Sequence, residues 1–482
     1  MASSALSNRY LEGNFAPVST EATVTDLAVE GTIPDFLDGR YVRNGPNPLE
    51  KPDPATYHWF MGTGMVHGVR LGDGRAQWYR NRWVRSAGVA TALGETVRPG
   101  PVHAGMDMSP NTNVISFAGS TLALVEGGAH PYELSDELDT LRPFDFAGTL
   151  GGGYSAHPLV DPATGELHSV SYFWAWGGRV RYQVVGLDGR VRKHVDLDVG
   201  GLPMMHAFSL TEHYVVLYDL PVTFDLSRAS GAAKRLPAGA ARRAAGLVSR
   251  HGVPDAVAGS ISRRAGAGSD FPYSWDPHRP ARVGLLPRDG AAGDLRWYDV
   301  GPCYVYHPVN AFEEDGRVVA YVVRHPSTFV SDRHGPFEAM PTLERWSIDP
   351  AVSTVKEEQL DDRGLEFPRV DDRRCGRPQR YSYSVGVDAA GVPSGSLLRH
   401  DYVGERTTAR HFGPGCELSE FVFVPSSAAS AEDEGVLIGF VYDRPADRSD
   451  LRILDAATLE AVGTVHLQAR VPHGFHGNWL PS

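Results

Sequence analysis

The sequence predicts an all-β fold built from many short strands. Short apolar, β-branched runs recur along the chain and are separated by Asp-Gly turns at residues 72–74, 188–189 and 315–316. The 53 glycines and 35 prolines are spread evenly, as expected when many short elements are joined by many turns. Strands do not alternate with helical segments, so a parallel sheet is not indicated.

Two stretches illustrate the strand pattern. Residues 169–173, 180–185 and 191–195 are predicted to form three consecutive antiparallel strands, and the pattern recurs near the C-terminus at residues 436–442, 451–455 and 463–467. Strands this short and numerous are typical of a sandwich, a barrel or a propeller. The length of 482 residues favours a propeller of about six to eight four-stranded blades, without a second domain.

Two regions depart from this pattern. Residues 1–54 look irregular, with a tight turn predicted at Gly45-Pro-Asn-Pro48. Residues 228–264 are rich in Ala, Arg and Gly, which predicts either a solvated, partly helical surface insertion or a basic element resting on an anionic membrane surface. A single acid, Asp255, accompanies the basic residues of this stretch, which are Lys234, Arg235, Arg242, Arg243, Arg250, Arg263 and Arg264.

Composition excludes several classes of protein. The formal net charge of −12 argues against a nucleic-acid-binding protein, which needs a basic face to neutralise phosphates. Cys303, Cys375 and Cys416 show no C-x-x-C spacing, so neither a disulfide framework nor a thiolate metal site is indicated. The sequence shows no signal peptide and no membrane-spanning run. We therefore expect a cytoplasmic protein that can contact a membrane peripherally.

Histidine is the residue type that points to chemistry. The chain lacks a P-loop, a G-x-G-x-x-G motif, a G-x-S-x-G elbow and an H-E-x-x-H motif. Of its 19 histidines, four lie at apolar, Gly- or Pro-flanked strand ends: His157, His206, His307 and His476. The inner strands of propeller blades surround one axis, so such distant residues can converge there, and four imidazoles favour iron, copper or zinc.

A rival metal site is present at His194-Val-Asp196. Its H-x-D spacing is that of iron oxygenases that use two histidines and one carboxylate. The motif follows Arg-Val-Arg-Lys and precedes Asp198 on what is predicted to be an exposed strand. We therefore favour the four-histidine site.

The chain resembles the carotenoid cleavage oxygenase family from Gly13-Asn-Phe-Ala-Pro17 to its C-terminus. The matching pieces follow the family's order and include Arg40-Tyr-Val-Arg-Asn-Gly-Pro-Asn-Pro48 and His473-Gly-Phe-His-Gly477. The other matching pieces are residues 64–68, 111–113, 122–128, 157–158, 206–208, 307–312, 366–369 and 420–425.

This resemblance implies a seven-bladed propeller with a helix-and-loop dome over one face. Residues 1–482 would form a single propeller domain, with dome insertions that include about 221–265. It further implies Fe(II) held by His157, His206, His307 and His476, with Glu126, Glu366 and Glu420 as acceptors for the imidazole N–H groups. In the closing motif it places the metal ligand at His476, with His473 as a neighbour that positions the turn. Thr112 matches a threonine that crowds one open metal position.

The implied reaction is the oxidative cleavage of a C=C bond of a lipophilic polyene by O₂, giving two carbonyl products. One branch of the family cleaves carotenoids or apocarotenoids. Another cleaves hydroxylated stilbenes and phenylpropenes, using a lysine where this chain has Val125, and some relatives are isomerases. Because an apolar Val125 cannot stabilise a phenolate, we favour a carotenoid or apocarotenoid substrate. A propeller that served only to bind other molecules would not need the four buried histidines.

The remaining expectations concern the substrate tunnel and assembly. Aromatic residues at Phe60, Trp83 and Trp174 are candidates for the wall of a dry tunnel, together with Val125. The protein is expected to be a monomer whose partners are a lipophilic small molecule and O₂.

Overall fold

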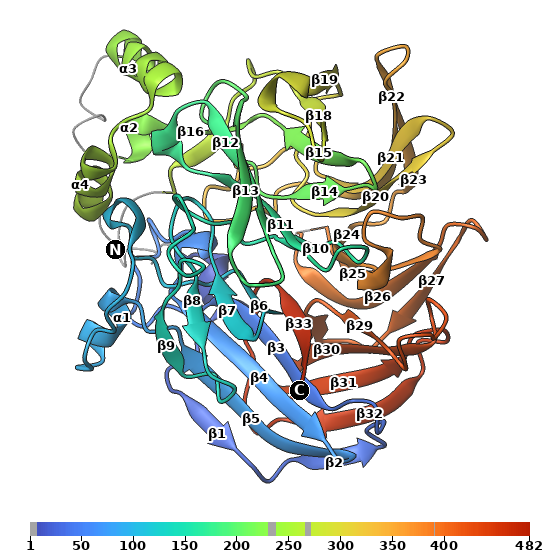
Figure 1. Ribbon diagram of the computed structural model, residues 1–482. Helices are drawn as coiled ribbons and strands as arrows, with labels where there is room; N and C mark the ends of the chain where they lie inside the picture. Colours follow the sequence, from blue (N-terminus) through green and yellow to red (C-terminus); the bar gives the residue numbers. More distant parts are fainter. Residues whose placement is uncertain (1–6, 230–237, 266–270, 390) are drawn as a thin grey trace, which may run out of the picture.

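A computed structural model describes residues 7–229, 238–265, 271–389 and 391–482. Seven antiparallel sheets of four or more strands surround one axis, so the predicted all-β, seven-bladed propeller is confirmed (Figure 1). We number the blades along the chain from blade 1 to blade 7 and give each from its innermost strand outward.

Blades 1 and 7 combine strands from both ends of the chain. Blade 1 contains β33 (Gly477–Pro481), β3 (Gly39–Pro46), β4 (Gly64–Gly72), β5 (Arg75–Trp83) and β1 (Ala22–Val24). Blade 7 contains β28 (Cys416–Leu418) and β29 (Val422–Pro425), which both pair with β30 (Gly435–Asp443), followed by β31 (Arg448–Asp455), β32 (Ala461–His466) and β2 (Ala28–Gly31).

The other five blades are each formed by one continuous stretch of chain with four strands. Blade 2 is β6 (Asn113–Phe117), β7 (Ser120–Leu124), β8 (Tyr132–Leu134) and β9 (Thr140–Pro143). Blade 3 is β10 (Leu159–Val160), β11 (Leu167–Tyr172), β12 (Arg179–Val185) and β13 (Val191–Asp198). Blade 4 is β14 (Phe208–Leu210), β15 (Tyr214–Asp219), β18 (Arg282–Pro287) and β19 (Arg296–Asp299). Blade 5 is β20 (Pro308–Glu314), β21 (Arg317–Arg324), β22 (Thr342–Asp349) and β23 (Thr354–Asp361). Blade 6 is β24 (Leu365–Arg369), β25 (Tyr381–Val387), β26 (Pro393–Asp401) and β27 (Arg406–His411).

Predicted Asp-Gly turns join neighbouring strands within the blades. Asp73 and Gly74 connect β4 to β5 with φ values of 53° and 65°, and Asp315 and Gly316 connect β20 to β21 with φ values of 49° and 75°. Two consecutive positive φ values define the two-residue hairpin turn whose twist matches that of the flanking strands. Sequence and backbone therefore agree at these turns.

The ring closes at two places between the N- and C-terminal segments. β33 pairs with β3, with Trp479 opposite Tyr41, and β2 pairs with β32, with Val29 opposite Val465. Apolar side chains fill the space between blades 1 and 7, where Val69 packs in the same cluster as Ile438 and Leu451. The closing stretch therefore completes the ring.

The N-terminal region is more regular than its sequence indicated. β3 lies between β4 and β33 with every residue buried, so its sequence shows no alternation of apolar and polar residues. The predicted turn at Gly45-Pro-Asn-Pro48 is wrong, because Gly45 and Pro46 end this strand. A Cβ at Gly45 would lie 2.6 Å from Cα of Gly474, so the close approach of the loop before β33 is the reason for glycine here.

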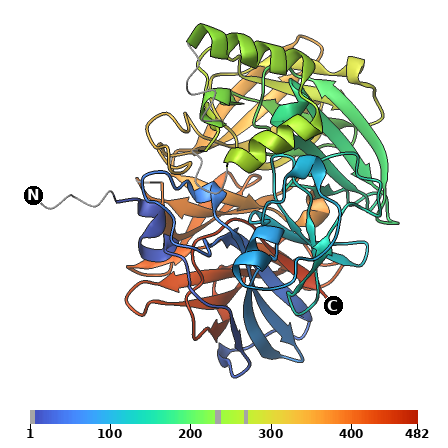
Figure 2. The same ribbon diagram turned by 90° about the vertical axis from the view of Figure 1, so that its left-hand side faces the viewer.

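The helices gather on one side of the propeller. They are α1 (Ala87–Ala92), α2 (Leu226–Ala229), α3 (Ala238–His251) and α4 (Asp255–Ala265), and they lie with the hairpin of β16 (Val222–Phe224) and β17 (Tyr273–Trp275). Figure 2 shows this face, with α3 and α4 in green above α1 in blue. Among the described residues, no helix is long and apolar enough to cross a membrane.

The basic stretch 228–264 is helical over most of its described length. Lys234 and Arg235 lie outside the described residues. Arg243 and Arg250 on α3 are exposed, which agrees with both a solvated insertion and a membrane-facing element.

Candidate metal centre

Seven functional candidates lie on or next to the innermost strands, one from each blade. His476 directly precedes β33, Thr112 precedes β6 and His307 precedes β20. His157 and His206 lie two residues before β10 and β14. On blades 6 and 7 the corresponding positions are occupied by Glu366, within β24, and Glu420, two residues before β29.

Four of these residues converge on one point. One ring nitrogen from each of His157, His206, His307 and His476 lies within 4.8 Å of the others. Nε2 of His476 is 2.9 Å from Nε2 of His157 and 3.1 Å from Nε2 of His307. Because imidazole is the commonest protein ligand of transition metals, this grouping has the residue types and the spacing of a metal site.

Carboxylates face the outer nitrogens of these rings. Nδ1 of His307 is 2.5 Å from Glu366, Nδ1 of His476 is 3.1 Å from Glu420 and Nδ1 of His206 is 2.6 Å from Glu126. Glu126 also lies 3.5 Å from Nδ1 of His157. An acceptor at Nδ1 holds the proton there and leaves Nε2 free to bind a metal.

Further donors fix these carboxylates. The hydroxyl of Tyr172 donates to Glu126 at 2.6 Å. The backbone N–H of Phe367 donates to Glu366 at 2.6 Å, and the backbone N–H of Gly477 donates to Glu420 at 2.7 Å. Phe367 has a φ of 52°, and its ring lies 5.3 Å from that of His307, so the strained backbone serves both contacts.

The electrostatic setting favours ionised carboxylates and, at His157 and His476, neutral rings. Burial and the neighbouring imidazoles hold the pKa of His157 well below its usual value, and burial lowers the pKa of His476 against the pull of Glu420. Burial would raise the pKa of Glu366, but His307 and His325 outweigh it, so this pKa is lowered. The pKa of His307 is raised, because Glu366 outweighs the effect of burial.

A large cavity leads to the histidines from the helical side. Its volume is about 1050 Å³, and His206, His307, His476 and Thr112 form part of its wall. Residues of α1 and the loop 48–53, several of them exposed, line its outer part. Most of the inner wall is apolar and aromatic, including Phe60, Val125, Trp174, Phe224 and Phe271. A wall of this kind suits a lipophilic ligand.

Comparison with known proteins decides the family. The family model described as "Retinal pigment epithelial membrane protein" matches residues 15–481. A protein of Mycobacterium tuberculosis named carotenoid cleavage oxygenase is 51% identical over 496 residues, covering 98% of both chains. The chain belongs to the carotenoid cleavage oxygenase family. The predicted resemblance and the enzyme class that it implies are thus confirmed.

Other members of the carotenoid cleavage oxygenase family are less similar in sequence but also match over nearly the whole chain. The apocarotenoid-15,15′-oxygenase of Synechocystis is 30% identical and covers 94% of this chain and 92% of its own. The crystal structure of cobalt-substituted Synechocystis ACO superimposes with a TM-score of 0.78 at 27% identity, covering 97% of each chain. This is a metal-dependent family, and the four-histidine cluster is where this member has a site for a metal.

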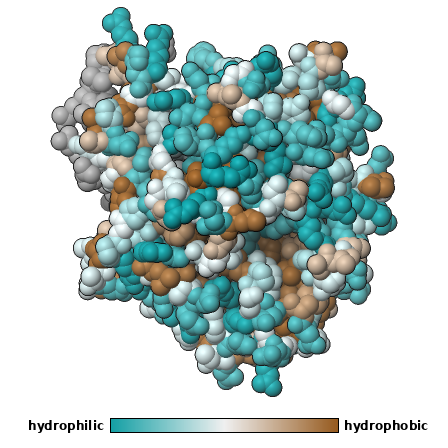
Figure 3. All heavy atoms as spheres, in the orientation of Figure 1, coloured by the Kyte–Doolittle hydropathy of each residue, from teal (hydrophilic) through white to brown (hydrophobic). Residues whose placement is uncertain are grey.

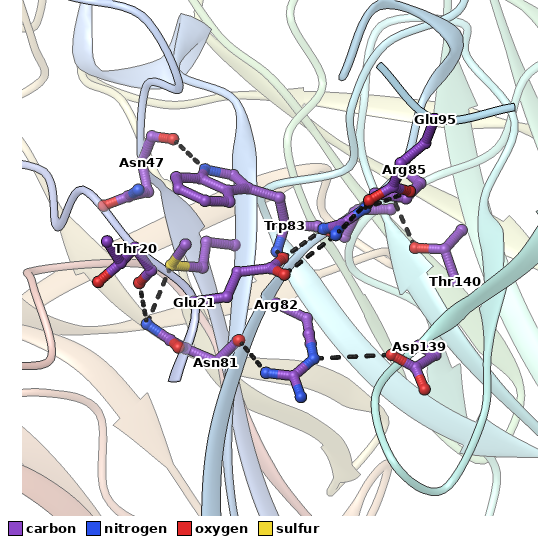
Figure 4. Close-up of polar contacts among 12 residues, drawn as sticks. Thr20, Glu21, Asn47, Asn81, Arg82, Trp83, Arg85, Glu95, Asp139 and Thr140 are labelled. Carbon is purple, nitrogen blue, oxygen red and sulfur yellow. Dashed lines mark hydrogen bonds and ion pairs between the residues drawn. The ribbon is translucent and has the colours of Figure 1, made fainter. Parts of the chain in front are cut away.

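The prediction that Trp83 lines the substrate tunnel of this oxygenase is wrong. Trp83 does not line the cavity; it packs against Met65 and Val89, and its indole N–H donates to the carbonyl of Asn47 at 2.8 Å (Figure 4). Trp83 is the last residue of β5, where the segment that leads to α1 begins. Phe60, Val125 and Trp174 do lie in the cavity wall, as does Thr112. Thr112 directly precedes the inner strand β6, and its role at an open metal position stays a prediction.

The rival H-x-D motif is not supported. His194 and Asp196 are exposed on β13, and Asp196 pairs with Arg181 at 2.5 Å. Sequence reasoning also missed two buried residues that contact the glutamates, Tyr172 and His325. His325 precedes a proline, as His157 and His307 do, and this pattern could have drawn attention to it, although His130, which lies outside the cluster, shares it.

Proposed function

We propose that this chain is an Fe(II)-dependent dioxygenase that cleaves a C=C bond of a carotenoid or apocarotenoid with O₂, giving two carbonyl products. The observation that carries the proposal is the four-histidine cluster at the wall of the apolar cavity. Membership in the carotenoid cleavage oxygenase family supports the same chemistry.

The donor set suits Fe(II). The ring nitrogens of His157, His206, His307 and His476 would hold the ion, and Glu126, Glu366 and Glu420 would orient three of those rings. Four neutral ligands leave the ion its full charge and open coordination positions. When bound, Fe(II) supplies the activation of O₂. The chain itself binds the polyene, orients one double bond beside the histidines and excludes water from that point.

The cavity favours a long, apolar substrate. Its volume of about 1050 Å³ is at the upper end of the range for small-molecule sites, and its aromatic wall suits a conjugated chain. Val125, next to Glu126, is 5% exposed and lies in the wall, so no cation is available at that position for a phenolate. A hydroxystilbene substrate is the second candidate, and a non-oxidative isomerase the third.

The test is a labelling experiment with the reconstituted enzyme. Protein loaded anaerobically with Fe(II) is given carotenoids, apocarotenals and hydroxystilbenes under ¹⁸O₂. We expect labelled carbonyl products from the carotenoid or apocarotenoid panel and no turnover by His307→Ala. Isomerised substrate without label would support the isomerase, and protein that binds no Fe(II) would refute the proposal.

The remaining proposals concern substrate entry, domain organisation, assembly and location. We propose entry of the substrate from a lipid surface on the helical side. Met61 in the cavity wall and Leu93 and Val97 after α1 are exposed there, and Figure 3 shows hydrophobic patches near α1. A single propeller domain spanning residues 1–482, a monomeric state and a cytoplasmic location stay predictions.

A further inference from the structure

Glu366 lies between two imidazoles, and only one of them belongs to the four-histidine cluster. Its Oε2 is 2.5 Å from Nδ1 of His307, and its Oε1 is 2.6 Å from Nε2 of His325. Glu366 is 2% exposed and His325 is fully buried. Both oxygens of this carboxylate are therefore occupied by ring nitrogens, an arrangement that differs from those of Glu126 and Glu420.

The other two glutamates are held by groups other than a second imidazole. The second oxygen of Glu126 accepts from the Tyr172 hydroxyl, and that of Glu420 accepts from the backbone of Gly477 and lies 3.5 Å from the Arg369 guanidinium. At Glu366 the backbone N–H of Phe367 reaches Oε2, the oxygen that His307 also contacts. Oε1 of Glu366 thus depends on His325.

Its surroundings fix the ring of His325. The backbone of His325 pairs with that of Tyr304 through two hydrogen bonds of 2.8 Å, just beyond the end of β21. The Tyr306 ring meets the His325 ring edge-on, with centroids 5.0 Å apart and planes at 87°. Nδ1 of His325 is enclosed and has no hydrogen-bond partner among the described residues. The proton therefore belongs on Nε2, where Glu366 accepts it.

We propose that His325 is a positioning residue for the metal centre, acting through Glu366 on His307. The Nε2–H of His325 holds the Glu366 carboxylate in the orientation in which its other oxygen accepts the Nδ1–H of His307. Nε2 of His307 is thereby kept directed at the site of the ion. This inference rests on the proposed function, because it presumes that His307 binds a metal.

Outer partners of metal-binding histidines act on affinity. Removing such a partner typically weakens metal binding by about 10- to 100-fold, even though the ligands themselves are intact. Without His325, Oε1 of Glu366 would be a buried, unpaired carboxylate oxygen, and the side chain would turn to relieve this. That turn would release His307 from its fixed tautomer.

Two amide substitutions of His325 separate the effect of its hydrogen bond from the effect of burying a polar side chain. The amide nitrogen of glutamine reaches the place of the histidine Nε2, whereas that of asparagine falls short of it. His325→Gln should retain the contact with Glu366, and His325→Asn should lose it with similar polarity and less volume. His400→Asn is the matched control, because His400 is also buried, lies 3.3 Å from the carboxylate of Asp361 and belongs to blade 6, away from the cluster.

The readout is binding of Co(II) to the metal-free full-length protein, followed by visible absorption and by competition with a chelator. We expect His325→Asn to weaken Co(II) about 10- to 100-fold and to shift its absorption bands, with His325→Gln and His400→Asn within about threefold of wild type. Wild-type affinity and spectrum in His325→Asn would overturn the inference, as would equal losses in His325→Asn and His325→Gln.

The outcomes separate this inference from the proposed function. A wild-type protein that binds no Co(II) and no Fe(II) refutes the proposed function and this inference together. A wild-type protein that binds metal and cleaves polyenes, with a His325→Asn variant that does both equally well, refutes the inference alone. Thermal unfolding of the metal-free variants, compared with His400→Asn, shows whether a loss of binding reflects a loss of folding.

Discussion

His473 and His476 are three residues apart, yet their rings contact different carboxylates. Nε2 of His473 lies 2.6 Å from Glu417, and Nδ1 of His476 lies 3.1 Å from Glu420. Only His476 belongs to the four-histidine cluster. The backbone of His473 donates to the carbonyl of Asn14, so this residue ties the closing turn to the N-terminal segment.

Alanine substitutions should separate the two histidines. His476→Ala should lose metal and activity, because it removes one of the four donors. His473→Ala should keep the metal and lower the free energy of unfolding by about 1–3 kcal/mol, since it removes the imidazole that contacts one oxygen of the buried Glu417 and leaves Arg444 as the remaining partner of that carboxylate. Metal content by elemental analysis and urea unfolding measure these effects. Loss of metal in His473→Ala with retention in His476→Ala would contradict the assignment.

Tyr172→Phe should weaken the centre without destroying it. The substitution removes the hydroxyl that donates to Glu126, whereas His206 keeps its 2.6 Å contact with that carboxylate. We expect a fall of about tenfold in metal affinity with a cavity of nearly the same shape. Tyr182→Phe is the control, because the Tyr182 hydroxyl contacts His168 at 2.7 Å on the same blade, away from the cluster. Equal affinities in the two variants would count against the role of Tyr172.

Val125→Lys should change the substrate preference. A lysine in this wall places a cation in an apolar space beside Glu126, which disfavours a polyene and favours a phenolate. We expect kcat/KM for carotenoids to fall by more than about tenfold and binding of hydroxystilbenes to rise, with Val125→Leu close to wild type. Unchanged preference would show that another group determines the substrate.

Charge reversal on α3 tests the membrane-facing interpretation of residues 228–264. Arg243 and Arg250 are exposed, and each basic residue near an anionic surface contributes about 1 kcal/mol to binding. Arg243→Glu with Arg250→Glu should therefore reduce sedimentation with phosphatidylserine vesicles at least tenfold. If binding matches that of wild type, the stretch is a solvated insertion.

Much of the fold and of the site could be predicted, because turn chemistry and side-chain type are local properties. The Asp-Gly turns and the histidines at strand ends were identifiable without coordinates. β3 was missed since a strand buried on both faces carries no alternation. Trp83 was misassigned because a large aromatic residue fits a protein core as well as a cavity wall. His325 was overlooked because its partner, Glu366, is distant in the sequence and is brought near by the packing of blade 5 against blade 6.

Because blades 1 and 7 combine strands from both ends of the chain, the complete metal site forms only when folding is complete. His157, His206 and His307 precede blades that each form from one continuous stretch of chain, whereas His476 arrives with β33, whose partner β3 comes from the opposite end of the sequence. A nascent chain that has folded its middle blades thus offers an ion only three of its four donors. Binding of a metal by all four histidines would therefore follow the docking of the final strand.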